Sequence, residues 1–140
     1  MKRLLVIVFT AVFVISAAPL SATEDSRLMR FPDIHGDRIV FTYGGDIWTV
    51  SSDGGLARRL TSDAGGEAFA KFSPDGEAIA FSASYDGNLD IYTMPARGGT
   101  PKRLTYHPFG DMMLDWHPSG DFLLMRSARK SKTNPGPRYN

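Results

Sequence analysis

The chain has 140 residues, of which 42% are hydrophobic and 22% are charged, an ordinary composition for one globular domain. Sixteen Lys and Arg residues stand against fifteen Asp and Glu residues, so the net charge of +1 favours neither nucleic acid nor an anionic membrane as a partner. The sequence has no cysteine, which excludes disulfides, cysteine-ligated zinc and thiol nucleophiles.

Residues 1–22 have the organisation of a secretory signal peptide. Lys2 and Arg3 form a basic start, residues 4–15 form an apolar core, and the segment up to Ala22 is rich in small residues. The apolar core is shorter than the roughly 18–20 residues that a membrane-spanning helix needs. We therefore expect a signal helix that is cleaved after Ala22, a periplasmic or secreted mature protein, and no stable membrane span after cleavage.

The next segment predicts short strands that are joined by tight turns. Residues 27–31 and 38–43 are the first two expected strands, because they are rich in apolar and β-branched residues, and a turn is expected between them at 32–37. The Gly-Gly pair at 44–45 can adopt the positive φ of a two-residue hairpin, which leads into a third expected strand at 46–51.

A second unit of the same kind follows. Residues 73–76 have the sequence SPDG, a β-turn in which proline presets φ, aspartate caps the backbone and glycine accepts a positive φ. In the strand after this turn, Ile79 and Phe81 point to one face and small residues point to the other, as expected for a sheet between two neighbours. Further turns at 85–88 and 97–100 divide this unit into four strands.

The two units repeat each other, and a third begins after them. The triplets Asp-Ile-Trp at 46–48 and Arg-Leu-Thr at 59–61 recur 44 residues later as Asp-Ile-Tyr and Arg-Leu-Thr. The segment Phe-Ser-Pro-Asp-Gly at 72–76 recurs, again 44 residues later, as Trp-His-Pro-Ser-Gly. A period of about 40–45 residues is typical of a four-stranded β-propeller blade.

We therefore predict an all-β fold of β-propeller blades, each a four-stranded antiparallel sheet, in a partial propeller that spans residues 23–140. The period places two complete blades at about 27–67 and 68–111, and about half of a third blade at 112–140. Blades bury their faces only against neighbouring blades, so we expect the first blade and the half blade to expose apolar surface. The chain should then either unfold over a broad temperature range or self-associate.

The first unit opens with RFPDIHGD at residues 30–37, IVF at 39–41 and DIW at 46–48. This opening resembles the amino-terminal start of the tricorn protease family, and the SPDG and RLT repeats are similar to that family and to TolB-like propellers over about residues 27–127. The resemblance implies a propeller that gates or channels peptides or protein segments towards a serine peptidase core. Further blades, a PDZ domain and that core would belong to a longer polypeptide, because no residue here corresponds to the family's catalytic serine or histidine.

Two other interpretations stay open. A TolB-like periplasmic propeller that binds proteins would share the repeats, although a TolB protein carries another domain before its blades, and here the repeats begin soon after Ala22. A prolyl-oligopeptidase-type hydrolase would also carry a propeller of this kind, and a GxSxG nucleophile elbow in a downstream domain would identify it.

No metal or cofactor site is predicted. The three histidines are His35, His107 and His117, and none has a partner at the spacing of a zinc motif. His107 and His117 each precede a proline in turn-like sequence. Residues 86–90 resemble the start of a calcium loop, but Ile91 occupies the position that needs glycine and Arg97 the position of the bidentate glutamate. A hairpin turn is the favoured interpretation of this segment.

No catalytic residue is predicted either. The sequence has no GxSxG elbow, and Ser73 and Ser119 lie in predicted turns. The basic segment at residues 126–132 lacks the aromatic residues that stack on bases, so it predicts a solvated hairpin and no nucleic-acid surface. Trp48 and Trp116 occupy positions that are aromatic in the neighbouring repeats, and both are expected in the core.

Overall fold

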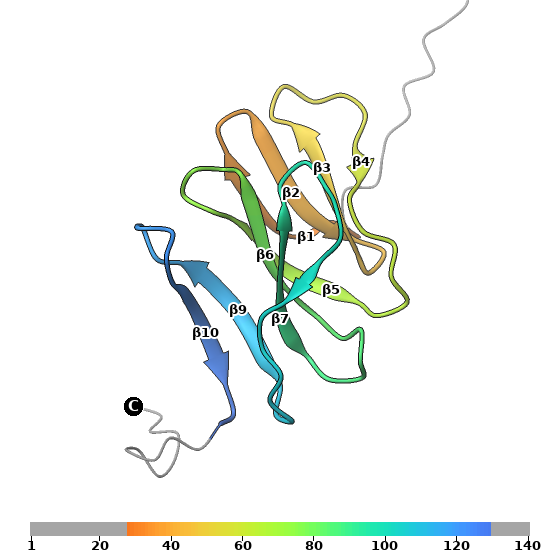
Figure 1. The fold of residues 1–140 in the computed structure, drawn as a ribbon. Coiled ribbons are helices and arrows are strands. Elements are labelled where there is room, and N and C mark those ends of the chain that lie inside the picture. Colours follow the sequence, from red (N-terminus) through yellow and green to blue (C-terminus); the bar gives the residue numbers. More distant parts are fainter. Residues whose placement is uncertain (1–27, 130–140) are drawn as a thin grey trace, which may run out of the picture.

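The computed structural model describes residues 28–129, in which ten β-strands form three antiparallel sheets (Figure 1). No helix in this range has the length and apolar character that a bilayer crossing needs. The predicted signal helix at residues 1–22 and the end of the chain from residue 130 lie outside the described range.

The first sheet has its four strands in sequence order. They are β1 (Arg30–His35), β2 (Arg38–Tyr43), β3 (Asp46–Ser51) and β4 (Arg58–Arg59). Gly44 and Gly45 join β2 to β3 with φ values of 63° and 92°, which explains why this hairpin needs glycine at both positions. The prediction of a turn at 32–37 is wrong, since β1 continues to His35. Pro32 is accommodated there because it lies at a β-bulge, where no ladder bond requires an N–H.

The second sheet repeats this arrangement with β5 (Glu67–Phe72), β6 (Ala78–Ala83), β7 (Asp90–Pro95) and β8 (Lys102–Arg103). Phe81 pairs with Tyr92 across β6 and β7 as Phe41 pairs with Trp48 across β2 and β3, so the two sheets share one register. Gly76 adopts a φ of 71° in the predicted SPDG turn between β5 and β6. The repeat in the sequence is therefore the repeat of one four-stranded unit.

The third sheet contains β9 (Asp111–Trp116) and β10 (Leu123–Ser127). The prediction of all-β propeller blades, two complete and about half of a third, is confirmed. The segment at 126–132, predicted to be a solvated hairpin, begins as the last two residues of β10 and continues from residue 130 outside the described range. The limits of the blades within the connecting segments stay predictions.

Successive sheets contact each other through their first strands, as can be followed in Figure 1: β1 contacts β5, and β5 contacts β9. The short fourth strands β4 and β8 lie at the opposite edge of each sheet and consist of arginine and lysine residues. The first strands therefore form the inner wall of the propeller, and the fourth strands form its rim.

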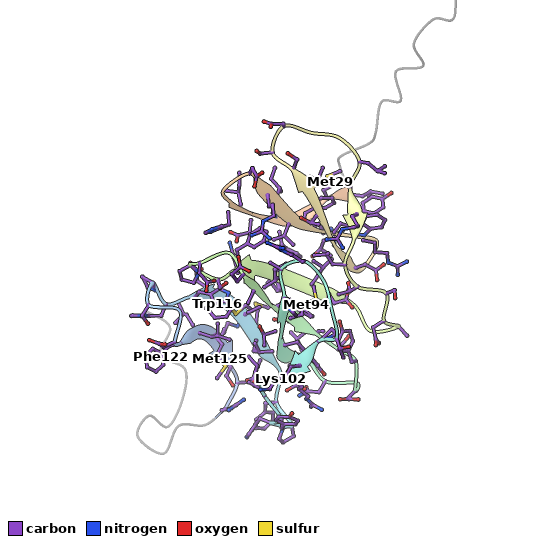
Figure 2. The ribbon with its side chains drawn as sticks, turned by 45° about the horizontal axis from the view of Figure 1, so that its top comes forward. Met29, Met94, Lys102, Trp116, Phe122 and Met125 are labelled. Atoms are coloured by element: carbon purple, nitrogen blue, oxygen red, sulfur yellow. The ribbon has the colours of Figure 1, made fainter. Side chains whose placement is uncertain are left out.

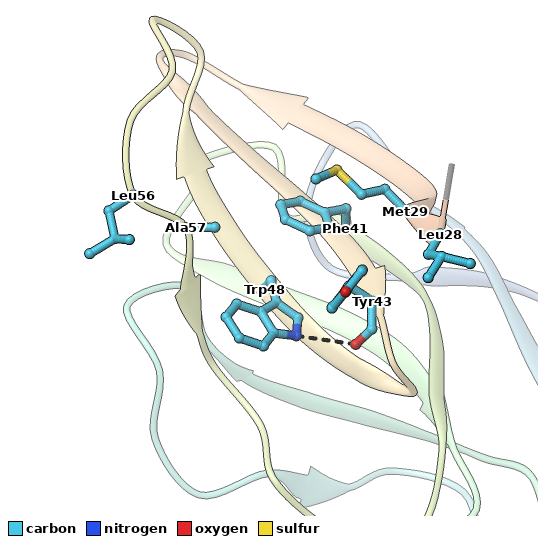
Figure 3. A pocket seen from close by; sticks show the side chains of 7 residues that line it. All are labelled: Leu28, Met29, Phe41, Tyr43, Trp48, Leu56 and Ala57. Carbon is cyan, nitrogen blue, oxygen red and sulfur yellow. Dashed lines mark hydrogen bonds between the residues drawn. The ribbon is translucent and has the colours of Figure 1, made fainter. Parts of the chain in front are cut away.

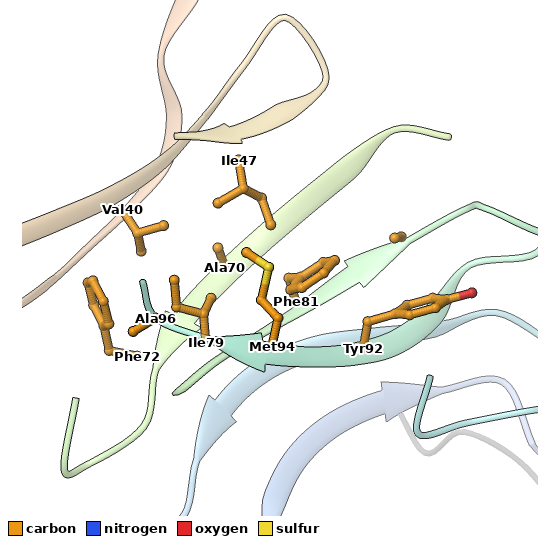
Figure 4. Close-up of a cluster of buried hydrophobic side chains, with 10 residues drawn as sticks. Val40, Ile47, Ala70, Phe72, Ile79, Phe81, Tyr92, Met94 and Ala96 are labelled. Atoms are coloured by element: carbon orange, nitrogen blue, oxygen red, sulfur yellow. The ribbon is translucent and has the colours of Figure 1, made fainter. Parts of the chain in front are cut away.

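The main core lies between the first two sheets (Figure 4). Val40 and Ile47 of the first sheet pack against the bulky face of the second sheet, which carries Ile79, Phe81 and Met94. Full burial of one such side chain typically stabilises a fold by about 1.5–3 kcal/mol. The contact between sheets is thus a large part of what holds each blade in place.

The opposite face of the second sheet is covered by the third sheet. Ala80 and Ile91 pack on Met113, and all three are buried. Trp116 is also half-buried but packs against this cluster, so the prediction of a core position holds in part. The same prediction is wrong for Trp48, which is half-buried on the outer face of the first sheet, because no sheet within residues 28–129 covers that face.

A threonine after the last strand of each of the first two sheets accepts a backbone amide of the third strand, and in the first sheet it also reaches the sheet that follows. The Ile47 amide donates to Thr61 Oγ1 at 2.8 Å, and Thr61 Oγ1 donates at 2.7 Å to Oε2 of Glu67, the first residue of β5. In the next repeat the Ile91 amide donates to Thr105 Oγ1 at 3.0 Å. The Arg-Leu-Thr triplet recurs because its threonine satisfies a backbone donor that folding removes from water.

The arginine of each triplet pairs with an aspartate at the start of the third strand. Arg59 contacts Asp46 at 2.8 Å, and Arg103 contacts Asp90 at 2.6 Å. The side chain of Asp90 is fully buried, and a buried carboxylate is stable only with a partner of opposite charge. Both repeated triplets therefore have structural roles.

Glu67 and Asp111 hold equivalent places, each as the buried first residue of a first strand, but their pKa values shift in opposite directions. Burial raises the pKa of Glu67 above its ordinary value of 4.5, and hydrogen bonds from neighbouring side chains, chiefly Thr61, offset only part of this effect. Burial also acts to raise the pKa of Asp111. Hydrogen bonds, chiefly those from Ser127 and Arg129, outweigh burial, so the pKa of Asp111 is lowered.

Replacing these carboxyls by amides is expected to change stability in opposite directions at neutral pH. The raised pKa of Glu67 gives a contribution to stability that is present below pH 4.5 and is lost as the pH rises through the folded-state pKa, so Glu67→Gln raises the free energy of unfolding at neutral pH. The lowered pKa of Asp111 gives a contribution to stability that is present above pH 3.8 and is lost as the pH falls through the folded-state pKa. Asp111→Asn therefore lowers the free energy of unfolding at neutral pH.

Urea denaturation of both variants between pH 3 and pH 8 measures the two signs. Each variant serves as the control for the other, because both positions begin a first strand. A Glu67→Gln variant that is destabilised at neutral pH as much as Asp111→Asn would contradict this account of the two carboxyls.

Candidate functional site

The first strand of each sheet carries a β-bulge. The register shifts between Arg30 and Asp33 in β1 and between Ala68 and Lys71 in β5, and the pairing of β9 with β10 shifts at the equivalent place. A bulge re-aims the side chains beside it and is common next to functional sites. Because the first strands form the inner wall, the bulges determine which side chains are presented there.

Phenylalanine occupies the bulge in the first two sheets. Phe31 and Phe69 have φ values of 52° and 58°, in a left-handed region that a bulky residue adopts at a cost of about 1–3 kcal/mol. Their rings lie against each other with centroids 4.2 Å apart. Phe69 also packs against the core between the second and third sheets. This packing offsets part of the backbone strain.

The two rings give the inner wall an aromatic surface. Phe31 is 40% exposed, whereas Phe69 is half-buried. An exposed aromatic ring can pack against an apolar side chain of an extended peptide without requiring a particular sequence. The sequence analysis missed this pair. Both residues lie on the strand before a repeated turn, but the sign of φ at a bulge cannot be deduced from that position.

The predicted turns of the second and third sheets border an open pocket of about 280 Å³, whose lining includes Pro74, Asp75, Trp116 and Ser119. A hydrogen bond from the Ser73 hydroxyl, followed by backbone amides, lowers the pKa of Asp75. The Trp116 indole N–H donates to a backbone carbonyl of β5 at 3.0 Å. These polar groups are engaged in holding the turns together, so the pocket offers no reactive group.

Ser119 and His117 approach each other as a nucleophile and a base would, with Oγ and Nδ1 2.9 Å apart. The Ser119 amide also donates to this Nδ1 at 3.1 Å, and the Asp121 amide donates to Ser119 Oγ at 3.3 Å. All these contacts lie within one turn. No carboxylate of residues 28–129 hydrogen-bonds to the His117 ring to orient it, so the pair has the geometry of a turn and not of a catalytic site.

The other segments considered for metal binding also have local structural roles. His35 packs on an aromatic ring of the second sheet, and His107 Nδ1 accepts a backbone amide of its own turn at 3.2 Å. In the segment that resembles a calcium loop, Asp86 and Asp90 both pair with Arg103. In the part of the chain that the structure describes, no group of three or more His, Asp or Glu side chains is arranged to hold a metal ion.

Comparison with known proteins agrees with this architecture. The family described as "Tricorn protease N-terminal beta propeller domain" matches residues 26–139. "Tricorn protease homolog 1" of Streptomyces coelicolor is 37% identical over 78 residues, which cover 56% of this chain and 7% of that protein. The chain thus spans less than a tenth of the length of this curated relative.

Two solved structures superpose on the chain with a TM-score of 0.60. The crystal structure of the tricorn protease is 31% identical and covers 70% of this chain and 10% of that chain. The structure of a putative TolB from Agrobacterium tumefaciens is 29% identical and covers 66% of this chain and 35% of that chain. Since the family match extends over most of the sequence, the chain belongs to the tricorn protease N-terminal β-propeller family.

Proposed function

We propose that this chain is the amino-terminal propeller part of a secreted tricorn-like serine peptidase, and that it gates or channels peptides towards a catalytic domain outside the chain. The observation that carries the proposal is the family match over residues 26–139, in a chain that spans less than a tenth of its tricorn relative. Its partners are then peptides and the rest of a longer polypeptide, with further blades, a PDZ domain and a peptidase domain.

The inner wall supports the gating role. A peptide that passes along the first strands meets the exposed ring of Phe31, which is held in place by Phe69 on the next blade. Backbone strain of this kind persists where the surrounding structure fixes it, and it is frequent at sites that bind ligands. The sheets on both sides provide a rigid support for the contact.

The family match favours this function over the two alternatives. The putative TolB and the tricorn protease superpose equally well, so the fold alone does not separate a TolB-like binding propeller from a tricorn propeller. The match to the tricorn family over residues 26–139 supports the tricorn propeller over the TolB-like one, and it also supports a tricorn-like peptidase over a prolyl-oligopeptidase-type hydrolase.

Substitution of Phe31 tests the gate in the protein encoded by the complete reading frame. We expect Phe31→Asp to raise KM for long peptides about fivefold, equivalent to about 1 kcal/mol of lost apolar contact, and to leave kcat unchanged. KM for a short chromogenic peptide, which needs no gate, should not change. Steady-state kinetics with both substrates measures the difference.

Leu104→Asp is the matched control, because Leu104 has nearly the same exposure as Phe31 but follows the outer strand β8. A reading frame that encodes no serine peptidase core would contradict the proposed function. An active peptidase in which Phe31→Asp leaves KM for long peptides unchanged would contradict only the role of the inner wall.

We also propose that the protein is exported and cleaved after Ala22. The basic start, apolar core and small-residue junction of the first 22 residues support this proposal. Amino-terminal sequencing of the exported product is expected to begin at Thr23. A product that still begins at Met1 would contradict it.

A further inference from the structure

The pocket of about 280 Å³ lies between the turns of the second and third sheets, both of which belong to this chain. It differs in this from the apolar groove of about 360 Å³ on the outer face of the first sheet (Figure 3), the face that a further blade covers in the longer polypeptide that we propose. The smaller pocket, called the turn pocket below, is lined by short polar and apolar side chains and one indole: Ser73, Pro74, Asp75, Ala78, Trp116, Ser119 and Gly120.

The turn pocket lies at one end of the inner wall. Trp116 is the last residue of β9, and Ser73 directly follows β5. Figure 2 shows Trp116 where the second and third sheets meet, and its indole N–H donates to the Lys71 carbonyl of β5. A peptide that passes along the first strands therefore passes the turn pocket.

Between the first and second sheets, two side chains of the first sheet fill the equivalent place. The Arg38 guanidinium lies over the Phe72 ring, with Cζ 5.3 Å from the ring centroid, and its Nη2 donates to the Gly76 carbonyl at 2.5 Å. The His35 ring packs on Phe72 with centroids 6.0 Å apart, and a Cβ on Gly76 would meet this imidazole at 2.2 Å. An arginine and a histidine thus occupy the space beside this turn.

In the next repeat these two side chains are replaced by small ones. Arg38 pairs with His35 across the turn of the first sheet. Across the turn of the second sheet, Ala78 faces Ser73 and accepts its backbone amide at 2.9 Å. Ala78 therefore holds the position of Arg38, and Ser73 holds the position of His35.

The partners of the arginine, in contrast, are retained. Trp116 and Phe72 are each the last residue of a first strand, and each pairs with the strand that follows the turn. Gly120 and Gly76 have φ values of 80° and 71°, and the amide of each donates to the carbonyl three residues before it. The turn pocket is therefore the place that Arg38 fills in the first repeat, left open in the second.

The turn pocket also carries negative charge. Its two turns, at residues 73–78 and 117–122, contain three carboxylates and no lysine or arginine. Asp75 accepts the Ser73 hydroxyl at 2.6 Å and the Glu77 amide at 3.0 Å, both through Oδ1, which leaves Oδ2 of this exposed side chain for another donor. These hydrogen bonds lower the pKa of Asp75, so its carboxyl is ionised at neutral pH.

We propose that the turn pocket binds the arginine side chain of a peptide, as the space between the first two sheets holds Arg38. The guanidinium lies over the Trp116 indole, the best aromatic partner for a cation, and donates to the Gly120 carbonyl and to Asp75 Oδ2. Arginine fits better than lysine, because a planar guanidinium stacks on a ring and donates in several directions at once. This inference rests on the proposed function, and it names arginine-containing peptides as the class that the inner wall favours.

Isothermal titration calorimetry of the protein encoded by the complete reading frame tests the inference. The probes are acetyl-Gly-Ser-Arg-Ser-Gly-amide and the same peptide with citrulline, which has nearly the shape of arginine but no charge. A covalent serine-peptidase inhibitor is added first, so that a peptidase active site contributes neither cleavage nor binding. The citrulline peptide is expected to bind at least about tenfold more weakly, because it lacks the cation that the indole and the carboxylate recognise.

Ala78→Arg locates the binding. It places in the second repeat the arginine that the first repeat carries, so the pocket is filled from within and the arginine peptide binds as weakly as the citrulline peptide. Thr100→Arg is the matched control, because it adds the same charge at an exposed position of the turn between β7 and β8, outside the lining of the turn pocket. This variant retains the preference for arginine.

Asp75→Asn is a second variant, which also serves if Ala78→Arg loses its β-sheet circular dichroism. The amide keeps an oxygen for the turn but loses the charge, so the affinity for the arginine peptide falls at least about fivefold. Glu77→Gln removes the same charge from the same turn outside the lining, and it leaves this affinity within about twofold.

Equal affinity of the unaltered protein for the two peptides, or no binding of either, would overturn the inference. A preference for arginine that persists in folded Ala78→Arg or Asp75→Asn protein would do the same. These outcomes are separate from failure of the proposed function, which is a reading frame without a serine peptidase core. The arginine peptide is expected to bind in that case as well, because both sheets of the turn pocket belong to this chain.

Discussion

A propeller blade is a sheet with two apolar faces, and each face has to be covered by another sheet. The second sheet meets this requirement on both sides, with Phe81 buried against the first sheet and Ile91 against the third. Within residues 28–129 the first and third sheets meet it on one side each. The repeated polar contacts and the inner wall both depend on this stacking of faces.

The stacking also connects stability to function. The hydrogen bond from Thr61 to Glu67 fixes where β5 begins, and β5 carries the bulge that presents Phe69. Phe69 in turn supports the exposed ring of Phe31 on the neighbouring blade. A gate for peptides needs such a fixed wall, since a contact surface that moves with the peptide cannot select among peptides. The contacts that hold the blades together therefore also position the surface that we propose as the gate.

The sequence predicted the repeating unit well, because its turns and triplets have local causes: the glycines of the turns adopt positive φ, and the Arg-Leu-Thr residues satisfy buried groups. It predicted β1 poorly. Pro32 suggested a turn, but it lies at a β-bulge and the strand continues through it. The position of Trp48 depends on a neighbouring sheet and not on its own segment. The rings of Phe31 and Phe69 touch across two neighbouring blades, and the period of the sequence does not reveal which residues of neighbouring blades come into contact.

Native-state hydrogen exchange, measured at a concentration where the chain is monomeric, tests most directly whether coverage of both faces is what stabilises a blade. The account predicts that the amides of β6 and β7 exchange most slowly, that those of β2 and β3 exchange faster, and that those of β10 exchange fastest. Equal protection in all three sheets, or slowest exchange in β2 and β3, would show that each sheet is stable without its neighbours and would contradict the account.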